Sequence, residues 1–390
     1  MGFQFRACSM NEAQDGCYGQ DLILRLFLSS LDAAQAPALQ LEHLLAEGWD
    51  RLPMPGSGRT LQRWQALANV AAHDLSLAKL YEGHTDALAI LSELQTVSPG
   101  HAASAIAAEH LFAPSGAAAG KERPPVWGVW AAEAPGSRVS IKIEPGAPYG
   151  TVRLHGRKAW CSGAQSGSHG LLTAWWTDDQ TGPQLVAVPL AQAGVEVCGD
   201  DWQAVGMGGS ASVQVSFDGA IGRCVGEVGA YLSRPGFWQG GAGIAACWYG
   251  GSMGIAGALH RSLADTPPVK RDRFRLAAAG RVDVTLRATA ALLRESASWI
   301  DSHPREDARP VALRARLAAV SCAESVLHEV GDALGATPFC RNRHFAQAAA
   351  DLPVFIRQSH GQTDYVGLGE FLVDTLVESA APAEGMPWAL

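Results

Sequence analysis

A change of hydrophobic period in the middle of the chain constrains its fold most. From about residue 126 to 223, apolar and polar residues alternate, as in "RVSIKIEP" and "GTVRLHGRKAW", and turns rich in Gly, Pro and Asp separate the runs. Alternation with period two is typical of half-buried β-strands, whereas the flanking segments repeat every three to four residues, as helices do. The sequence therefore predicts an α+β protein in which helices precede and follow a block of short strands.

We expect three domains along the 390 residues. They are an N-terminal α-helical domain over 1–125, a small antiparallel β-barrel or sandwich over 126–225, and a C-terminal four-helix-bundle domain over 226–390. Within the first, the residues "GHTD" (83–86) are expected to form a loop between two helices. The Gly-rich run "GFWQGGAGIAACWYGGSMGIAGAL" is apolar almost all round, which predicts a buried helix.

Charge and composition argue against several classes of protein. The formal net charge is -8, so a protein that follows nucleic-acid phosphates is not expected. No apolar run reaches the roughly 18 residues that a membrane helix needs, and the first residues lack the pattern of a signal peptide. The eight cysteines form no CxxC pair, so neither a zinc site nor a disulfide framework is expected. The sequence predicts a cytoplasmic protein with buried thiols and without metal, nucleic-acid or membrane partners.

The stretch "GRKAWCSGAQSGSHGLLTAWW" (156–176) holds three of the twelve tryptophans. A hairpin loop needs Gly and Ser for its backbone angles. It does not need a tryptophan and a hydroxyl at its mouth. Trp160 and Ser162 are therefore candidate functional residues, and the alternative is that Trp160 belongs to a barrel core and Ser162 to a turn.

Four stretches together resemble the acyl-CoA dehydrogenase superfamily of flavoproteins, over about residues 50–370. "VWAAEAPGS" is similar to the first flavin-contact strand of that family, and "GRKAWCSGA" to its Gly-x-Lys-x-Trp-x-Thr/Ser-x-Gly strand. "VGMGGSASVQVSFDGA" resembles its Gly-Met-Arg-Gly-Ser segment. "DALGATPFCRN" and the helix after "AADLPVFIRQSHGQTD" resemble its C-terminal flavin and substrate region. The resemblance implies the acyl-CoA dehydrogenase fold and FAD, or FMN if the protein is a monooxygenase.

The resemblance also implies where the flavin ring lies, namely between the β-domain and the C-terminal helices. Trp160 would pack against the ring system. Ser162 would offer its hydroxyl and its backbone N–H toward flavin N5, where a reduced flavin gains electron density. The other flavin contacts implied by the resemblance are Ala131, Ala132, Ser137, Gly331, Gly335 and Gly361.

Two flavin-binding features of the family are altered in this chain. Ala132 stands where the family has a threonine, so one hydroxyl toward the flavin is missing. The arginine that reaches the FAD diphosphate in the family has no clear match, and Arg261, Arg271 or Arg273 could substitute for it.

The usual catalytic glutamate of the family is absent. Dehydrogenation of an acyl thioester needs a carboxylate that takes the α-proton while the flavin takes a hydride. Here His360-Gly361 stands where the C-terminal Glu-Gly pair is expected, and the alternative position near Ile244 has no carboxylate. Asp364 is the nearest acid, one helical turn beyond His360. His360 and Asp364 are thus the catalytic candidates implied by the resemblance.

Three functions remain open. The first is an acyl-CoA dehydrogenase-like FAD oxidoreductase, which the resemblance favours. The second is a two-component flavin monooxygenase of the same fold, in which reduced flavin and O2 react and His360 shuttles a proton. The third is a catalytically silent flavin-binding or assembly subunit. The resemblance further implies an acyl-CoA or aromatic substrate, an electron-transfer flavoprotein or flavin reductase as redox partner, and a homodimer or homotetramer.

Overall fold

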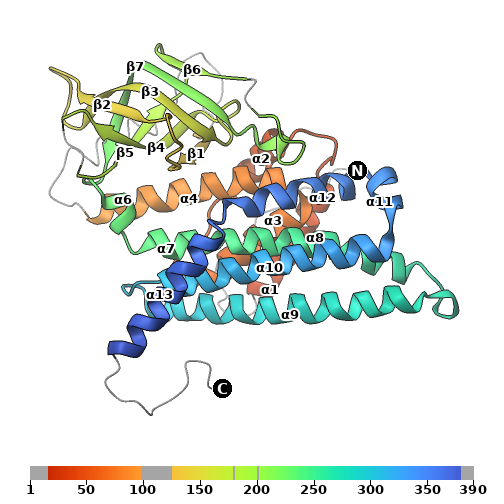
Figure 1. The fold of residues 1–390 in the computed structure, drawn as a ribbon. Coiled ribbons are helices and arrows are strands. Elements are labelled where there is room, and N and C mark those ends of the chain that lie inside the picture. The colour runs from red at the N-terminus through yellow and green to blue at the C-terminus, as the bar shows by residue number, and fades with distance from the viewer. Residues whose placement is uncertain (1–15, 98–124, 179–180, 200–201, 379–390) are drawn as a thin grey trace.

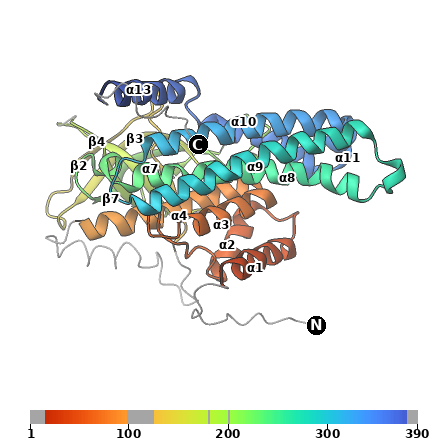
Figure 2. The same cartoon turned by 90° about the horizontal axis from the view of Figure 1, so that it is seen from below.

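The structure is a computed structural model that describes residues 16–97, 125–178, 181–199 and 202–378. It places a small β-barrel on a layer of helices (Figure 1). Seen from below, the long helices α8, α9 and α10 run side by side (Figure 2). The predicted order of helices, strands and helices is confirmed.

The described helices are α1 (Gly16–Ser30), α2 (Pro37–Ala46), α3 (Thr60–His73), α4 (Leu75–Val97), α6 (Ala230–Ser233), α7 (Gly236–Gly241), α8 (Gly243–Ala264), α9 (Arg273–Ser302), α10 (Arg309–Leu334), α11 (Ala336–Arg341), α12 (Arg343–Phe355) and α13 (Gln362–Glu378). The described strands are β1 (Trp127–Trp130), β2 (Val139–Ile143), β3 (Thr151–Cys161), β4 (His169–Trp176), β5 (Gln184–Pro189), β6 (Val195–Val197) and β7 (Val213–Val225). The Gly-rich run predicted as one buried helix is divided between α7 and α8.

The strands close into a barrel because β4 pairs with β5, β5 with β7, β7 with β3, β3 with β2, and β2 again with β4. The prediction of an antiparallel block is wrong in one respect. Among the described strands, β4 runs parallel to both β1 and β2, while the other pairings are antiparallel. A parallel pair needs a crossover connection, and here the β2–β3 hairpin lies between β1 and β4 in the chain and supplies it.

N-terminal and C-terminal helices share one apolar core. Buried side chains of α1 to α4, such as Trp64 and Leu77, belong to the same cluster as Trp248 of α8 and Val326 of α10. A second cluster fills the barrel, and a third lies between the barrel and α4. Because α3 packs directly on α8 and α9, the N-terminal and C-terminal helices do not form separate layers. The predicted domain boundaries and the C-terminal four-helix bundle stay predictions.

The predicted "GHTD" loop is wrong, because α4 runs through these residues without a break. The chain breaks earlier, at Asp74, which has an extended backbone (ψ 130°). Its carboxylate accepts the N–H of Leu77 at 2.6 Å and so caps the start of α4. Gly83 and His84 serve the contact with the barrel instead, since His84 Nδ1 accepts the backbone N–H of Trp127 at 3.1 Å.

Over the part of the chain that the structure describes, none of the helices has both the length and the apolar character needed to cross a bilayer. The same residues contain no cluster of His, Cys, Asp and Glu side chains arranged to hold a metal ion.

Candidate flavin site

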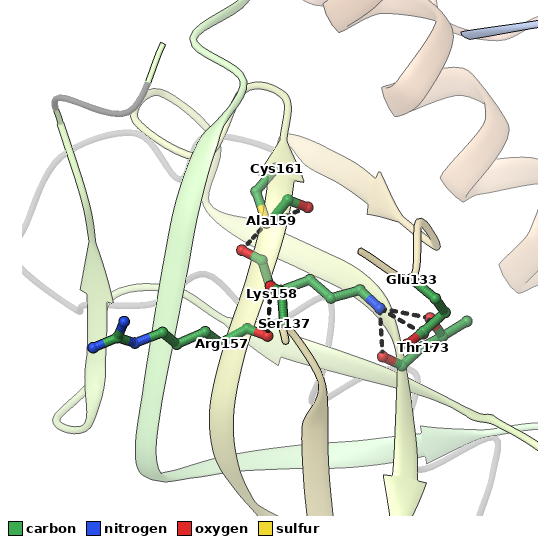
Figure 3. A network of polar contacts seen from close by, with 7 residues as sticks. All are labelled: Glu133, Ser137, Arg157, Lys158, Ala159, Cys161 and Thr173. Carbon is green, nitrogen blue, oxygen red and sulfur yellow. Dashed lines mark hydrogen bonds and ion pairs between the residues drawn. The ribbon is translucent and has the colours of Figure 1, made fainter. Parts of the chain in front are cut away.

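A buried lysine fills a gap in the sheet beside β1 (Figure 3). The pairing of β1 with β4 ends at Leu172, and the pairing of β2 with β4 begins at Trp175, so no described strand faces Thr173 on this edge. Lys158, whose side chain is fully buried, donates from Nζ to the Thr173 carbonyl at 3.0 Å and to its hydroxyl at 2.8 Å. The ammonium thus replaces the strand that is missing there.

The same ammonium holds Glu133 in place. Its Nζ lies 2.8 Å from Glu133 Oε1, which also accepts the Thr173 hydroxyl at 2.6 Å. Burial lowers the pKa of Lys158, and the hydrogen bond to Glu133 opposes that shift. Partial burial would raise the pKa of Glu133, but the hydrogen bonds from Lys158 and Thr173 outweigh it and keep that pKa below its usual range. The pair therefore fixes the segment Ala131–Ala132 that links β1 to Glu133.

Sequence reasoning missed the pair of Lys158 and Glu133. A signal was nevertheless present: Val152, Leu154 and Lys158 occupy inward positions of the alternating strand, and β3 buries all three. A lysine at an inward position of a barrel strand requires acceptors, because an unpaired buried ammonium is costly.

Trp160 is the next-to-last residue of β3, and Ser162 begins the turn that follows the strand. Trp160 has φ 56°, a left-handed conformation that residues other than glycine rarely adopt, and 60% of its surface is exposed. The Ser162 hydroxyl bonds to the Ser212 hydroxyl at 2.7 Å. The Ser162 N–H, which the resemblance directs toward the flavin, donates instead to the Trp160 carbonyl at 3.0 Å.

A second strained loop lies against this turn. Met207 (φ 59°) and Ala211 (φ 43°) are the other non-glycine residues with left-handed φ among the described residues. The N–H of Gly163 donates to the Ser210 carbonyl at 2.8 Å, and the Ser210 hydroxyl bonds to Ser212 at 2.9 Å. Such conformations cost about 1–3 kcal/mol each and cluster at functional sites. Their gathering here marks this end of the barrel as a candidate site.

The second loop is fastened to α12. The N–H of Met207 donates to the Asp351 carboxylate, which also accepts Gln347 Nε2 at 2.7 Å. Burial raises the pKa of Asp351, and these hydrogen bonds oppose the rise. Gly206 lies so close to the Ala350 carbonyl that a Cβ at this position would collide with it. The helical layer thus helps to set the backbone beside Ser162.

A small enclosed space lies between this turn and α4. It has a volume of about 10 Å³, and Lys79, Gly83, Val129 and Ser162 are among the residues that line it. That volume holds about one water molecule. A flavin ring would therefore have to lie on the open face of Trp160 and not inside this space.

The sequence-predicted site residues fall in three places within one chain. Ala131, Ala132, Ser137, Trp160 and Ser162 belong to the β-domain, where the Ser137 hydroxyl donates to the Arg157 carbonyl at 3.2 Å. Gly331 and Gly335 lie at the end of α10 next to α11, at the end of the helical layer away from the barrel (Figures 1 and 2). His360, Gly361 and Asp364 lie at the start of α13.

The two catalytic candidates differ in burial. The His360 side chain is 75% exposed, and its Nδ1 lies 3.4 Å from Asp364. The Asp364 carboxylate is buried, accepts the backbone N–H of His360 at 3.2 Å and lies 3.6 Å from the guanidinium of Arg316. Asp364 therefore caps α13 and pairs with Arg316, whose guanidinium lies 5.6 Å from the ring centre of Trp248.

Comparison with known proteins shows the fold. No protein-family model and no curated protein sequence matches the chain. Solved structures match at high similarity of fold, and the chain has the acyl-CoA dehydrogenase fold, as its motifs predicted.

Three of these structures illustrate the range of proteins that share the fold. A complex of KijD3 with FMN and a dTDP-3-amino-4-keto sugar matches with a TM-score of 0.74 and 17% identity, over 95% of both chains. TdsC of Paenibacillus sp. A11-2, a dibenzothiophene monooxygenase, matches in complex with FMN and indole with a TM-score of 0.72 and 19% identity, over 93% of this chain and 96% of TdsC. Butyryl-CoA dehydrogenase of Megasphaera elsdenii matches with a TM-score of 0.72 and 13% identity, over 93% of this chain and 100% of that enzyme.

Proposed function

We propose that this protein is a flavin-dependent oxidoreductase and that it acts as a monooxygenase supplied with reduced flavin. One observation carries the flavin proposal: Trp160 stands exposed in a left-handed conformation beside the Ser162 hydroxyl. A large exposed aromatic face at the end of a buried strand calls for a partner. A planar ring is the partner that this face fits.

The residues around Trp160 suit a flavin. Its indole would stack on one face of the ring system, and the Ser162 hydroxyl would donate to the ring edge. Ala131 and Ala132 follow the last paired residue of β1, so their backbone groups lie outside the strand ladder and within reach of a ligand. Lys158 and Glu133 keep that segment fixed. Bound there, a flavin supplies two-electron redox chemistry.

The C-terminal segment favours a monooxygenase over a dehydrogenase. A dehydrogenase needs a carboxylate that is free to take a proton. Asp364 is instead held by Arg316 and by the N–H of His360. Two of the similar structures, KijD3 and TdsC, contain FMN, and TdsC is a monooxygenase. We assign the proton-shuttle role to His360 and the orienting role to Asp364.

FMN is the cofactor proposed first, with FAD as the alternative. Of the three arginines that could contact a diphosphate, Arg271 is engaged elsewhere. Its Nε donates to the carbonyls of Leu263 and Thr266, each at 3.0 Å, and closes the end of α8. FMN does not need that contact, because it lacks the second phosphate and the adenosine.

A flavin reductase and a second copy of the chain are the proposed partners. The reductase would supply reduced flavin. Val269 and Phe274, at the connection between α8 and α9, are 94% and 84% exposed, and a subunit contact would cover them. Sedimentation of the purified protein at several concentrations tests this: a dimer or tetramer supports the contact, and a monomer refutes it.

The reaction type is tested by two measurements on the purified protein. We expect tighter binding of reduced than of oxidised FMN, measured by titration without oxygen, because a monooxygenase receives its flavin reduced. We also expect butyryl-CoA and octanoyl-CoA to leave the 450 nm band of bound flavin unchanged without oxygen. Bleaching by either thioester would instead establish dehydrogenation. Failure to bind FMN and FAD in either redox state would refute the flavin proposal itself.

A further inference from the structure

A cavity of about 240 Å³ lies where the end of α4 meets α7 (Figure 1). Its other walls are the loop 54–56 before α3 and the connection between α9 and α10. No described residue borders both this cavity and the small space beside Ser162, and their nearest residues on α4, Gly83 and Ala89, are about 9 Å apart along the helix axis. A cavity of about 150 Å³ can hold benzene, so this one has room for a single-ring molecule.

One buried polar group at this cavity has an unused acceptor. Gln239 lines the cavity and is 3% exposed, and its Nε2 donates to the Pro304 carbonyl at 2.9 Å. That bond turns the amide oxygen Oε1 toward Gly56, where a Cβ on the glycine would come within 2.6 Å of it. No described residue donates a hydrogen bond to Oε1. A buried acceptor without a donor is costly, so a donor group in the cavity would stabilise it.

The charges at the cavity form a pair. Arg234, whose side chain is 5% exposed, donates to Glu93 at 2.7 Å, and its guanidinium lies 5.3 Å from the ring centre of Tyr231. Glu93 also accepts the N–H of Gly236 at 2.9 Å. A charged molecule would be attracted by one member of this pair and repelled by the other. The cavity therefore favours a neutral molecule.

Apolar side chains supply much of the remaining wall. They are Met54, Pro55, Ala89, Pro235 and Pro304. Binding sites for small molecules typically combine such a wall with a few polar groups that fix the orientation of the ligand. This lining suits a molecule with an apolar body next to its donor group.

The loop on one side of the cavity is fixed within the protein. Asp301 of α9 accepts the N–H groups of Gly58 and Thr60, each at 2.9 Å, and the Thr60 hydroxyl at 2.6 Å. The Thr60 hydroxyl oxygen in turn accepts the N–H of Gly56 at 2.9 Å. Gly56 has φ 70°, which glycine adopts readily. A wall that is already in place lowers the entropic cost of binding.

We propose that this cavity is a second small-molecule site. Its ligand is a neutral molecule of single-ring size that donates an N–H or O–H hydrogen bond to Gln239 Oε1 and packs its apolar part against Met54 and Ala89. A wholly apolar molecule would leave the amide oxygen unpaired, and an ion would meet a like charge at the pair of Arg234 and Glu93. The proposal does not depend on the flavin site, since no described residue borders both spaces.

The test uses phenol and toluene, which have almost the same shape and differ in one hydroxyl group. Calorimetric titration of the full-length protein gives the dissociation constant of each. Gln239→Met keeps a side chain of similar length without the amide oxygen. We expect phenol to bind this variant at least about fivefold more weakly, and toluene to bind it within about twofold of the natural protein. Each probe is compared with itself, so the difference in hydration between phenol and toluene cancels.

Three results would overturn the proposal: no binding of phenol by the natural protein, unchanged phenol binding by Gln239→Met, or equal weakening of both probes. Ala89→Leu takes the place of Gln239→Met if the latter does not fold. It fills the cavity and should weaken phenol binding at least about tenfold. Ala291→Leu, which adds the same side chain at an exposed position of α9, should leave phenol binding intact. Phenol binding that is the same in these two leucine variants would place phenol elsewhere and refute the assignment.

Charged probes and FMN complete the test. Benzoate and protonated benzylamine should both bind more weakly than phenol, and tighter binding of either would rule out a neutral ligand. Phenol should bind equally well with and without FMN. Displacement of phenol by FMN would locate phenol at the proposed flavin position and contradict the second site, whereas failure of FMN to bind, with the effect of Gln239→Met retained, counts against the flavin site alone.

Discussion

In the barrel, Lys158 donates to Thr173 and Glu133 through three hydrogen bonds, whereas in the helical layer Asp86 has no described partner. Lys158 is fully buried and Asp86 is half-buried, so both bear a desolvation cost. Only for Lys158 do hydrogen bonds within the protein offset the free-energy cost of desolvation. The contrast indicates that the barrel uses its buried charge to fix backbone, whereas the desolvation cost of Asp86 is not offset by a hydrogen bond from a described residue.

The two sides of the proposed flavin position differ in the same way. On the barrel side Ser162, Ser210 and Ser212 bond to one another, and the backbone around them is held in strained conformations. On the helical side Lys79 borders the same small space, and its ammonium is paired with Glu82 at 2.9 Å. A rigid, neutral wall suits a cofactor of constant shape.

The largest effect is expected at Lys158. Replacement by methionine keeps the length of the side chain but leaves the Thr173 carbonyl and Glu133 without their donor. We expect a loss of about 2–3 kcal/mol in the free energy of unfolding, reduced from the value for a fully buried pair because Glu133 is partly exposed. Urea denaturation measures this loss.

The control is Lys142→Met, at an exposed position of β2, which should change the free energy of unfolding by less than about 0.5 kcal/mol. If both variants lost the same amount, the pair of Lys158 and Glu133 would not hold the barrel backbone in place.

A smaller effect with two opposite signs is expected at Trp160. Trp160→Gly relieves the left-handed backbone, so the free energy of unfolding should rise by about 1 kcal/mol. The same change removes the stacking face, and the dissociation constant of FMN should rise at least tenfold. Trp160→Phe keeps an aromatic face and should bind FMN within about threefold of the natural protein. Unchanged FMN binding by Trp160→Gly would refute the stacking role.

The smallest effect is expected at Asp86 and depends on pH. Because burial raises its pKa in the folded protein, ionisation of Asp86 opposes folding. The free energy of unfolding is therefore not reduced by Asp86 below the ordinary pKa of aspartate, about 3.9. It declines as pH rises through the raised pKa of Asp86 in the folded protein. A substitution at Asp86 leaves the charged and titratable groups around it unchanged, so a comparison of variant and natural protein isolates Asp86. These groups are Glu82, Arg63, Lys79, Arg234 and Tyr231.

Asp86→Asn removes this decline without a large change of shape. We expect it to match the natural protein near pH 4 and to be more stable by about 1 kcal/mol near pH 8, as thermal unfolding across that range would show. Parallel pH profiles for the two proteins would mean that Asp86 is not held unpaired in the folded state.

Local sequence patterns predicted what depends on local structure. The alternation around Val152 and Leu154 predicted β3, and the apolar character of the Gly-rich run predicted the buried helix α8. The tryptophan and hydroxyl at the end of β3 were singled out because a turn does not need them. The structure places Trp160 at the surface, where the alternative of a barrel-core residue does not apply.

Features that depend on contacts between distant segments were not predictable in this way. The parallel pairing of β4 with β1 and β2 is set by the route of the chain, which alternation does not reveal. The "GHTD" residues have turn-like composition, but Gly83 and His84 belong to a helix because they meet β1 there. Asp86 belongs to the same four residues, so reading them as a loop hid its place in α4.

The most direct test of the central claim is a crystal structure of the protein with FMN. The account predicts electron density for the flavin ring over the indole of Trp160, with the Ser162 hydroxyl within hydrogen-bonding distance of the ring. Density for FMN at another place, or a Trp160 face covered by polypeptide while FMN is bound elsewhere, would contradict it.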